Sequence, residues 1–205
     1  MKTKPLFITG IGTGIGKTLI SAIIVEKLKA DYWKPVQSGD LDNSDSLKVR
    51  ELVANTTSYF HPETYRLTQP YSPHKSAALD GIIIEEDKFV LPQTNSTLII
   101  EGAGGLMVPL NDHFLMIDLI KKLNADVVLV SQNYLGSINH TLLSADVLKQ
   151  RDIPVKGIIF NGDSEPASED YIASYTRFPI LGSIPTLPTI NKQTVGEAAR
   201  LINIS

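Results

Sequence analysis

Short apolar runs alternate with stretches of helical spacing along the 205-residue chain. The apolar runs are typical of strands buried on both faces, and they fall at residues 6–8, 32–36, 98–100, 126–130, 155–160 and 180–181. Apolar residues at helical spacing fall at residues 18–30, 45–54, 137–151 and 193–202. This alternation predicts an α/β fold in which helices cover both faces of one parallel sheet.

Residues 55–84 interrupt the alternation. They contain turn-forming residues such as Pro70, Pro73 and Gly81, which are typical of loops. A long excursion of this kind is the type of segment that forms binding loops. No repeat, low-complexity segment or linker divides the sequence, so we expect one domain over residues 1–205.

Composition narrows the classes of function. The formal net charge of −3 gives no electrostatic support for binding nucleic acid or an anionic membrane. Cysteine is absent, which excludes disulfides, thiolate metal sites and cysteine nucleophiles. No apolar run approaches membrane-spanning length, and residues 1–5 leave no room for a signal peptide before the first strand. We therefore expect a cytoplasmic protein.

The stretch between the first predicted strand and helix is rich in glycine and ends in Gly16, Lys17 and Thr18. Glycines allow consecutive backbone N–H groups to face a ligand, and the helix start adds unpaired N–H groups and a positive dipole end. Lys17 adds a full charge, and the Thr18 hydroxyl is suited to Mg²⁺. The stretch therefore predicts a phosphate-binding P-loop. It is one residue longer than the common motif, because the nearest first glycine is Gly10 and Ile11 occupies the usual position.

A second interpretation of residues 9–16 is the nucleotide-cofactor turn of a short-chain dehydrogenase. Tyr71 and Lys75 even have the spacing of the catalytic pair of those enzymes. Pro73 would break the helix that this pair needs, and Lys34 stands where an acidic residue is expected to bind the ribose. A glycine-rich turn without any ligand is the third interpretation.

Polar side chains gather where the predicted strands end, at Lys34, Ser38, Glu101 and Asn161. In parallel sheets, ligands bind beyond the carboxyl ends of the strands, so these side chains predict a site there. Glu101 directly follows a buried run, and a buried carboxylate needs a partner or a metal. An Mg²⁺ ion held by Thr18 and one or two carboxylates fits the preference of that ion for few protein ligands plus phosphates.

Several of these candidates have a second interpretation. Lys34 alone would also suit a solvated surface position. Asp45 is either an acid that stabilises the start of a helix through the helix dipole or a metal ligand. Asn161 is either a ligand or an ordinary turn residue before Gly162. The four histidines have no metal-ligand spacing, so we expect them to be structural or exposed.

From the first strand to about Leu187 the chain resembles the dethiobiotin synthetases, the ATP-dependent carboxylases of biotin synthesis. Each shared motif is short, but their order and their places at successive strand ends make the set specific. The long P-loop is itself a feature of that family. The motifs are Gly16-Lys17-Thr18, Trp33-Lys34-Pro35-Val36-Gln37-Ser38-Gly39, Asn43-Ser44-Asp45, Ser72-Pro73-His74, Glu101-Gly102-Ala103-Gly104-Gly105, Leu135-Gly136-Ser137-Ile138-Asn139-His140, Asn161 and Ile184-Pro185-x-Leu187.

This resemblance implies a single-domain fold of P-loop type that binds ATP and Mg²⁺. Lys17, Lys34 and Thr13 are the implied catalytic residues, and Mg²⁺ is implied to bind Thr18, Asp45 and Glu101. Asn161 and the Pro185 region are implied to meet the adenine. The full implied ATP-binding set is Gly14, Ile15, Gly16, Lys17, Thr18, Leu19, Asp45, Glu101, Gly102, Ala103, Gly104, Asn161, Gly162, Pro185 and Leu187.

The resemblance also implies the substrates and a homodimer. One amine of 7,8-diaminononanoate captures CO₂ as a carbamate, the carbamate attacks the γ-phosphate, and the second amine closes a cyclic urea. The far carboxylate of the diamine would meet backbone N–H groups at the start of a helix in a partner subunit, so the sites would lie at the subunit interface. The implied substrate-binding residues are Thr13, Lys34, Ser38, Gly136, Ser137, Ile138 and Asn139.

The chain departs from this family at Gly14, where many members carry an acid. Residues 85–97 are shorter than the usual covering helix, which predicts that this helix is reduced, and Lys192 stands where the acid on the adenine side would fall. Cobyrinic and cobyric acid synthases share the fold, but they depend on a cysteine glutaminase domain. ParA-type ATPases carry an additional loop lysine where this chain has Gly12.

Overall fold

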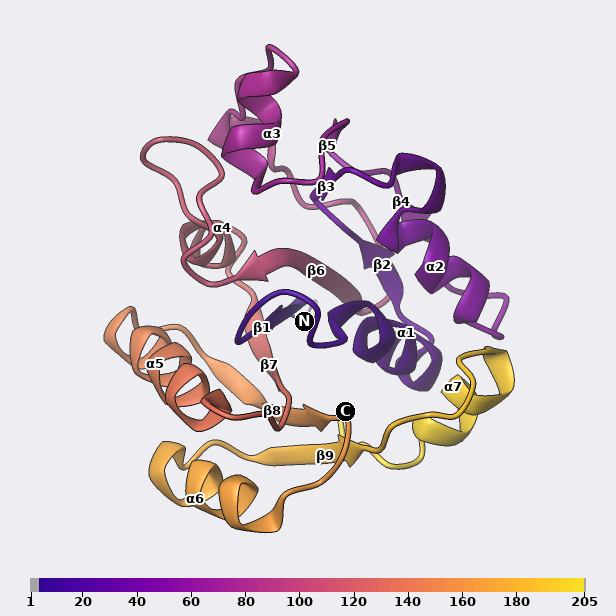
Figure 1. The fold of residues 1–205 in the computed structure, drawn as a ribbon. Helices are drawn as coiled ribbons and strands as arrows, with labels where there is room; N and C mark the ends of the chain where they lie inside the picture. Colours follow the sequence, from indigo (N-terminus) through magenta and orange to yellow (C-terminus); the bar gives the residue numbers. More distant parts are fainter. Residues whose placement is uncertain (1–3, 205) are drawn as a thin grey trace.

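A seven-stranded sheet forms the centre of the protein, in the order β4-β2-β6-β1-β7-β8-β9 (Figure 1). The structure is a computed structural model and describes residues 4–204. Residues 1–3, which belong to the short segment expected before the first strand, and residue 205 lie outside the described residues. All neighbouring strands of the sheet run parallel. The strands are β1 (Leu6–Gly10), β2 (Asp31–Trp33), β4 (Phe60–His61), β6 (Leu98–Gly105), β7 (Asp126–Ser131), β8 (Val155–Asn161) and β9 (Ile180–Ile184).

Helices cover both faces of this sheet, which confirms the predicted fold class. One apolar core includes Ile8 and Ile99 and packs under α1, α2 and α7. The other includes Phe7 and Ile100 and packs under α4, α5 and α6, so successive strand residues alternate between the two cores. No helix within residues 4–204 is long and apolar enough to cross a membrane. The helices are α1 (Lys17–Leu28), α2 (Asp45–Leu52), α3 (Pro73–Leu79), α4 (Met116–Lys122), α5 (Ser137–Gln150), α6 (Pro166–Thr176) and α7 (Lys192–Ala198).

The strand predicted over residues 32–36 is in fact two strands. After β2 the chain leaves the main sheet at Lys34 and Pro35, and β3 (Val36–Ser38) pairs instead with β5 (Tyr65–Leu67) in a separate two-stranded sheet. Proline has no N–H for a central strand, and β2 has neighbours on both sides. The break carries residues 36–38 away from the main sheet and into the two-stranded one.

The strand predicted over residues 98–100 is longer than expected, because β6 continues through Glu101 to Gly105 and pairs there with Gly10 of β1. Residues 85–97 contain no α-helix, only the single 3₁₀ turn Glu86–Lys88, as the shortened segment predicts. Helices α4 and α6 were not predicted.

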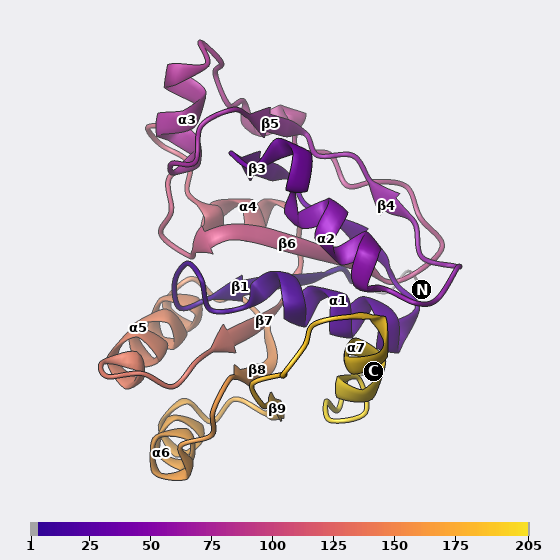
Figure 2. The same cartoon turned by 45° about the vertical axis from the view of Figure 1, so that its right-hand side comes forward.

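The excursion over residues 55–84 is partly ordered into β4, β5 and α3. Seen from the side, α3 and the two-stranded sheet stand beyond the end of β6, above the loop that joins β1 to α1 (Figure 2). The excursion therefore forms a wall opposite the glycine-rich loop, at the carboxyl edge where the ligand site is predicted.

Candidate active site

The glycine-rich loop is held in shape by two glycines and one asparagine. Gly14 and Gly16 have φ angles of 78° and 87°, in the left-handed region that favours glycine. A Cβ atom at Gly16 would lie 2.1 Å from Nδ2 of Asn161. The same Nδ2 donates a hydrogen bond of 2.9 Å to the carbonyl oxygen of Ile15. Asn161 at the end of β8 therefore supports the loop from behind.

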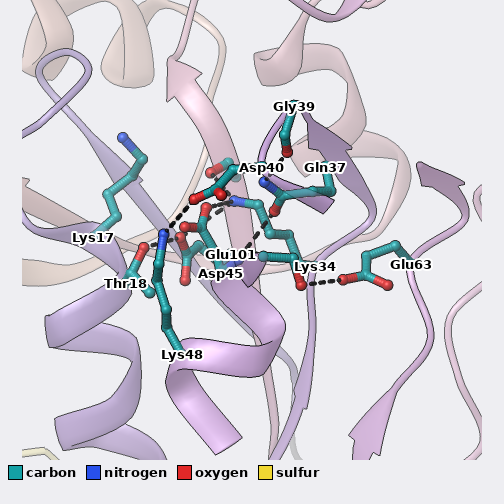
Figure 3. Close-up of polar contacts among 12 residues, drawn as sticks. Lys17, Thr18, Lys34, Gln37, Gly39, Asp40, Asp45, Lys48, Glu63 and Glu101 are labelled. Atoms are coloured by element: carbon teal, nitrogen blue, oxygen red, sulfur yellow. Dashed lines mark hydrogen bonds and ion pairs between the residues drawn. The ribbon is translucent and has the colours of Figure 1, made fainter. Parts of the chain in front are cut away.

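Lys17 is buried at the start of α1, with its ammonium turned back onto the loop. Nζ of Lys17 donates to the carbonyl oxygen of Gly12 at 2.9 Å, and Figure 3 shows the side chain standing apart from the carboxylates beside it. Burial lowers the pKa of Lys17 to about 8, and the charge of Glu101 only partly offsets this. The Gly12 carbonyl is the one side-chain hydrogen-bond partner of this ammonium within residues 4–204, and Lys17 lines a pocket, so its remaining N–H groups can bind an anion such as a phosphate.

Lys34 has the opposite environment. Its Nζ lies 2.8 Å from Oδ2 of Asp45 and 3.2 Å from Oε1 of Glu101 (Figure 3). The lysine side chain is 5 % exposed and that of Glu101 is 1 % exposed. Burial alone would lower the pKa of Lys34, but Glu101 and Asp45 together raise it above its usual value. The ammonium is therefore charged in the folded protein and fixed between two carboxylates.

Glu101 receives hydrogen bonds on both oxygens. The Thr18 hydroxyl donates to Oε1 at 2.9 Å, and the Tyr32 hydroxyl donates to Oε2 at 2.8 Å. Tyr32 is fully buried, and burial followed by the negative charge of Glu101 raises its pKa well above the usual value. Together with the Lys34 ammonium, these two hydroxyls satisfy a carboxylate that lies inside a strand.

Asp45 is positioned by the start of α2. The Ser44 hydroxyl caps this helix by accepting from the backbone N–H of Leu47 at 3.4 Å, and Oε1 of Gln37 accepts from the backbone N–H of Asp45 at 3.2 Å. Burial would raise the pKa of Asp45, but the Lys34 ammonium holds it below its usual value. Asp45 is the first residue of a helix and also faces Lys34. This placement is compatible with both interpretations of Asp45, as an acid that stabilises the helix start and as a metal ligand.

These groups line one pocket of about 690 Å³. It contains most of the predicted site: Thr13, Gly14, Gly16, Lys17, Thr18, Lys34, Ser38, Asp45, Glu101, Gly102, Ala103 and Gly104. The excursion supplies the opposite wall, which the sequence did not predict in detail: Pro70, Tyr71, Ser72 and Pro73, together with Val36, Gln37 and Val108.

Other predicted residues lie elsewhere. The Ile15 side chain is 3 % exposed and packs in the core under α1, where Leu19 is also partly buried, so these two can offer a ligand mainly their backbone. Asn161 ends β8 and Gly162 follows it, and the Gly162 N–H donates to the carbonyl oxygen of Ile184 at 2.8 Å. Pro185 and Leu187 follow that residue, at the end of β9.

The start of α5 faces a separate hollow of about 1050 Å³ between α5 and α6. The predicted residues Gly136, Ser137, Ile138 and Asn139 line it, together with Asp163, Glu165 and Tyr171 from the loop and helix opposite. The structure does not bring these four residues into the pocket of Lys34.

The structure does not support the catalytic pair Tyr71 and Lys75 of the dehydrogenase interpretation. Pro73 is the first residue of α3 and Tyr71 precedes the helix, so Tyr71 and Lys75 do not share a helix face. Instead, Nζ of Lys75 lies 3.8 Å from the centre of the Tyr71 ring. The structure also adds one residue that the sequence analysis missed: Tyr32, whose only signal was a tyrosine inside an apolar run two positions before Lys34.

The oxygen donors of the pocket fit a hard divalent cation. Thr18 supplies a hydroxyl that bonds Glu101, and Asp45 and Glu101 already share one cation, the Lys34 ammonium. No group of three acidic, histidine or cysteine side chains within residues 4–204 could hold a metal by itself. Two carboxylates and a hydroxyl suit Mg²⁺, which keeps waters and takes further ligands from phosphates.

Comparison with known proteins agrees with this geometry. The family model described as AAA domain matches residues 4–194. The chain is 51 % identical to the ATP-dependent dethiobiotin synthetase BioD of Christiangramia forsetii, over 96 % of this chain and 94 % of that protein. It is 50 % identical to the protein of the same name from Cytophaga hutchinsonii, over 94 % and 93 %, and 42 % identical to that of Chlamydia pneumoniae, over 93 % and 85 %.

Solved structures support the same fold. The MinC:MinD cell division protein complex of Aquifex aeolicus aligns with a TM-score of 0.63 at 14 % identity, covering 97 % of this chain and 95 % of that one. The septum site-determining protein MinD of Pyrococcus horikoshii, complexed with Mg-ADP, aligns with a TM-score of 0.59 at 16 % identity, over 95 % and 86 %. At these identities the match shows the P-loop fold alone.

Proposed function

Since the chain belongs to the dethiobiotin synthetase family, and is thus an ATP-dependent ligase, we propose that it makes dethiobiotin from 7,8-diaminononanoate, CO₂ and ATP, with release of ADP and phosphate. The observation that carries this proposal is the fixed ammonium of Lys34. It lies in the same pocket as the glycine-rich loop, with Asp45 at 2.8 Å and Glu101 at 3.2 Å.

In this proposal the reaction has three steps. One amine of the diamine adds to CO₂ and loses a proton, which gives a carbamate. A carbamate oxygen attacks the γ-phosphorus, the bond from that phosphorus to the β-γ bridging oxygen breaks, and ADP leaves, so that the carbamate and the transferred phosphoryl group form a carbamic-phosphoric anhydride. The second amine then attacks the carbamate carbon, expels phosphate and closes the cyclic urea.

The second step needs positive charge placed in advance, because a carbamate anion approaches a nucleotide that is already strongly negative. Lys17 and Lys34 supply two ammonium groups on the loop side of the pocket. Thr13 and Ser38 offer hydroxyls on the same pocket to the diamine or the carbamate. When bound, Mg²⁺ held by Thr18, Asp45 and Glu101 would neutralise charge on the phosphate oxygens.

The nucleotide would lie along the loop from Gly14 to Leu19, with its phosphates at the start of α1. Gly102, Ala103 and Gly104 face the same pocket from β6. On the adenine side we propose Asn161, Gly162, Pro185 and Leu187, since the ends of β8 and β9 lie behind the loop. Because the reaction consumes ATP, we also infer that the protein works in the cytoplasm.

The hollow at the start of α5 supports a homodimer in this proposal. Gly136, Ser137, Ile138 and Asn139 present the N-terminus of a 14-residue helix there, which favours a carboxylate. These residues do not reach the Lys34 pocket of their own chain, so a second copy would present them to the far carboxylate of the diamine. A bulky replacement at Gly136 should then weaken binding of the diamine more than binding of ATP.

The direct test incubates the protein with ATP, Mg²⁺, bicarbonate and diaminononanoate. The expected products are ADP and dethiobiotin in equal amounts, identified by mass. Reactions without the diamine or without bicarbonate are the controls, and ADP formation that does not depend on the diamine would contradict the proposal. Thermal stabilisation by ATP with Mg²⁺, but not by NAD(P), separates the proposal from a dehydrogenase.

A further inference from the structure

We propose that Tyr32 is a positioning residue that fixes the Glu101 carboxylate for the metal-nucleotide complex. The inference rests on the proposed function, because Glu101 is a metal ligand only there. Tyr32 and Glu101 lie on neighbouring strands, β2 and β6, and Tyr32 pairs with Ile99. Side chains two residues apart on a strand share a face, so Ile99 and Glu101 both point to the α1 side, where Tyr32 is also packed.

The two oxygens of Glu101 have different partners. Oε1 accepts from the Thr18 hydroxyl at 2.9 Å and from Nζ of Lys34 at 3.2 Å. Oε2 is held by Tyr32 alone among the side-chain hydrogen bonds of residues 4–204, at 2.8 Å. The last torsion of a glutamate side chain is broad, and the phenol restricts it from the side opposite to Thr18 and Lys34. Oε1 is thereby presented to the pocket and Oε2 to the interior.

Tyr32 is well suited to this role because it is packed and hydrogen-bonded within the core. The residue is 0 % exposed, its ring lies 6.1 Å from that of Phe60, and its backbone N–H donates to the carbonyl oxygen of Tyr59 at 2.8 Å. Partners that orient the ligands of a metal in this way commonly change metal affinity by about 10- to 100-fold. Tyr32 touches none of the reacting atoms in the proposed reaction, so it acts only through Glu101.

The test compares Tyr32→Phe with the parent protein and with Tyr65→Phe as a matched control. The Tyr65→Phe change also removes one hydroxyl, which accepts a hydrogen bond from the backbone N–H of Glu85 at 2.8 Å. Tyr65 lies outside the pocket. Binding of Mn²⁺ in the presence of ADP is measured directly, from the electron paramagnetic resonance signal of the free ion. We expect Tyr32→Phe to weaken Mn²⁺ binding about tenfold and Tyr65→Phe to leave it unchanged. Binding of ADP without metal should be the same in all three proteins.

A merely structural tyrosine predicts another result, in which the melting temperature falls and the affinity for Mn²⁺ with ADP stays at the parent value. That result would overturn the proposal. A second measurement separates an effect through Glu101 from general damage to the fold. In a Glu101→Gln background, removal of the Tyr32 hydroxyl should change Mn²⁺ affinity no further, because its effect passes through the carboxylate. Additive losses in this double-mutant cycle would also count against a role through Glu101.

The binding experiment does not need turnover, so it separates this proposal from the proposed function. If the parent protein makes no dethiobiotin but Tyr32→Phe still weakens Mn²⁺ binding with ADP, the reaction is wrong and Tyr32 keeps its role. If the parent makes dethiobiotin, the Mg²⁺ concentration for half-maximal turnover should rise by the same factor in Tyr32→Phe. Turnover at saturating Mg²⁺ should then return towards the parent value.

Discussion

Two lysines on one pocket have opposite environments. Lys17, in the glycine-rich loop region, is buried against a carbonyl oxygen and its pKa falls to about 8. Lys34, after β2, is also buried, but two carboxylates raise its pKa. Burial alone therefore does not decide whether an ammonium stays charged, since the nearby carboxylates decide it. Among the ion pairs of residues 4–204, Lys34 has two carboxylate partners and Lys17 has none, so Lys17 is the better placed of the two to bind a phosphate.

The largest effect should come from Lys34→Gln. The ammonium can contact both the carbamate and the γ-phosphate, and its interaction strengthens as charge shifts during transfer. We expect kcat to fall by about a hundredfold or more, the range of one strong electrostatic contact, while ATP affinity changes far less. Steady-state kinetics with a direct ATP titration measure both, and Lys122→Gln, whose lysine pairs with Asp87 away from the pocket, is the control.

Lys34→Arg sharpens the same point. The guanidinium keeps the charge but is larger and planar, so it should fit poorly between two carboxylates at the distances of Lys34, and kcat should stay low. An unchanged kcat in Lys34→Gln would remove the catalytic role. A collapse of ATP binding with kcat preserved at saturation would make Lys34 a binding residue.

A smaller effect on turnover, but a larger one on binding, should come from Lys17→Ala. The variant loses a charge-assisted contact to the β- and γ-phosphates, so ATP affinity should fall about ten- to a hundredfold and most phosphoryl transfer should be lost. The fold should survive, because the replaced ammonium makes one hydrogen bond, to the carbonyl of Gly12, within the described residues 4–204. Calorimetric titration with ATP tests this, and Lys27→Ala at the other end of α1 should bind ATP normally.

Glu101→Gln tests one of the two carboxylates that distinguish the surroundings of Lys34 from those of Lys17. The amide keeps the shape of the side chain but loses the charge that binds a cation, so the Mg²⁺ concentration for half-maximal turnover should rise about tenfold or more. Turnover is measured across Mg²⁺ concentrations, with circular dichroism to follow folding. If the variant turned over normally at low Mg²⁺, the metal site at Thr18, Asp45 and Glu101 would be wrong.

The smallest effect should be a slope of stability with pH. The pKa of Lys17 is lowered in the folded state, so between about pH 8 and 10.5 the unfolded chain binds more protons than the folded one. The free energy of unfolding therefore gains a positive contribution with rising pH in that window. The raised pKa of Lys34 has the opposite sign, since its contribution is present below pH 10.5 and is lost only above that value.

Urea unfolding at several pH values from 7 to 10.5 measures this slope in the parent and in Lys17→Ala. The parent should gain stability relative to the variant as the pH rises through the window, because only the parent releases a proton on folding there. Parallel curves for the two proteins would show that the Lys17 ammonium is not desolvated.

The sequence predicted a parallel sheet covered on both faces and most of the pocket, because glycines, buried runs and strand-end charges are local signals. It could not predict that β6 continues through Glu101, since a carboxylate is tolerated inside a strand only when Thr18, Lys34 and Tyr32 converge on it from other elements. Pro35 is present in the sequence as a residue that disfavours a central strand. The new pairing of residues 36–38 could not be predicted, because their partner β5 lies in the irregular excursion.

The missed helices have a similar explanation. In α6 only Ile172 and Thr176 are buried, while Tyr171 and Tyr175 are exposed, so the apolar spacing that marks a covering helix is weak. Helix α4 has only seven residues, too short for a clear periodic signal. The site residues that stay predictions depend on groups outside this chain: Pro185 and Leu187 on the nucleotide, and residues 136–139 on a second subunit.

The contact between Gly16 and Asn161 has an evolutionary consequence. A side chain at residue 16 meets both an unfavourable φ angle and the amide of Asn161, and loss of that amide removes the hydrogen bond to the carbonyl oxygen of Ile15. A substitution at either position alone would change the shape of the loop. Among descendants of this gene, a change at residue 161 should be accepted together with compensating changes in residues 14–16. Residues 16 and 161 lie 145 positions apart in the sequence, yet we expect the two segments to change together during evolution.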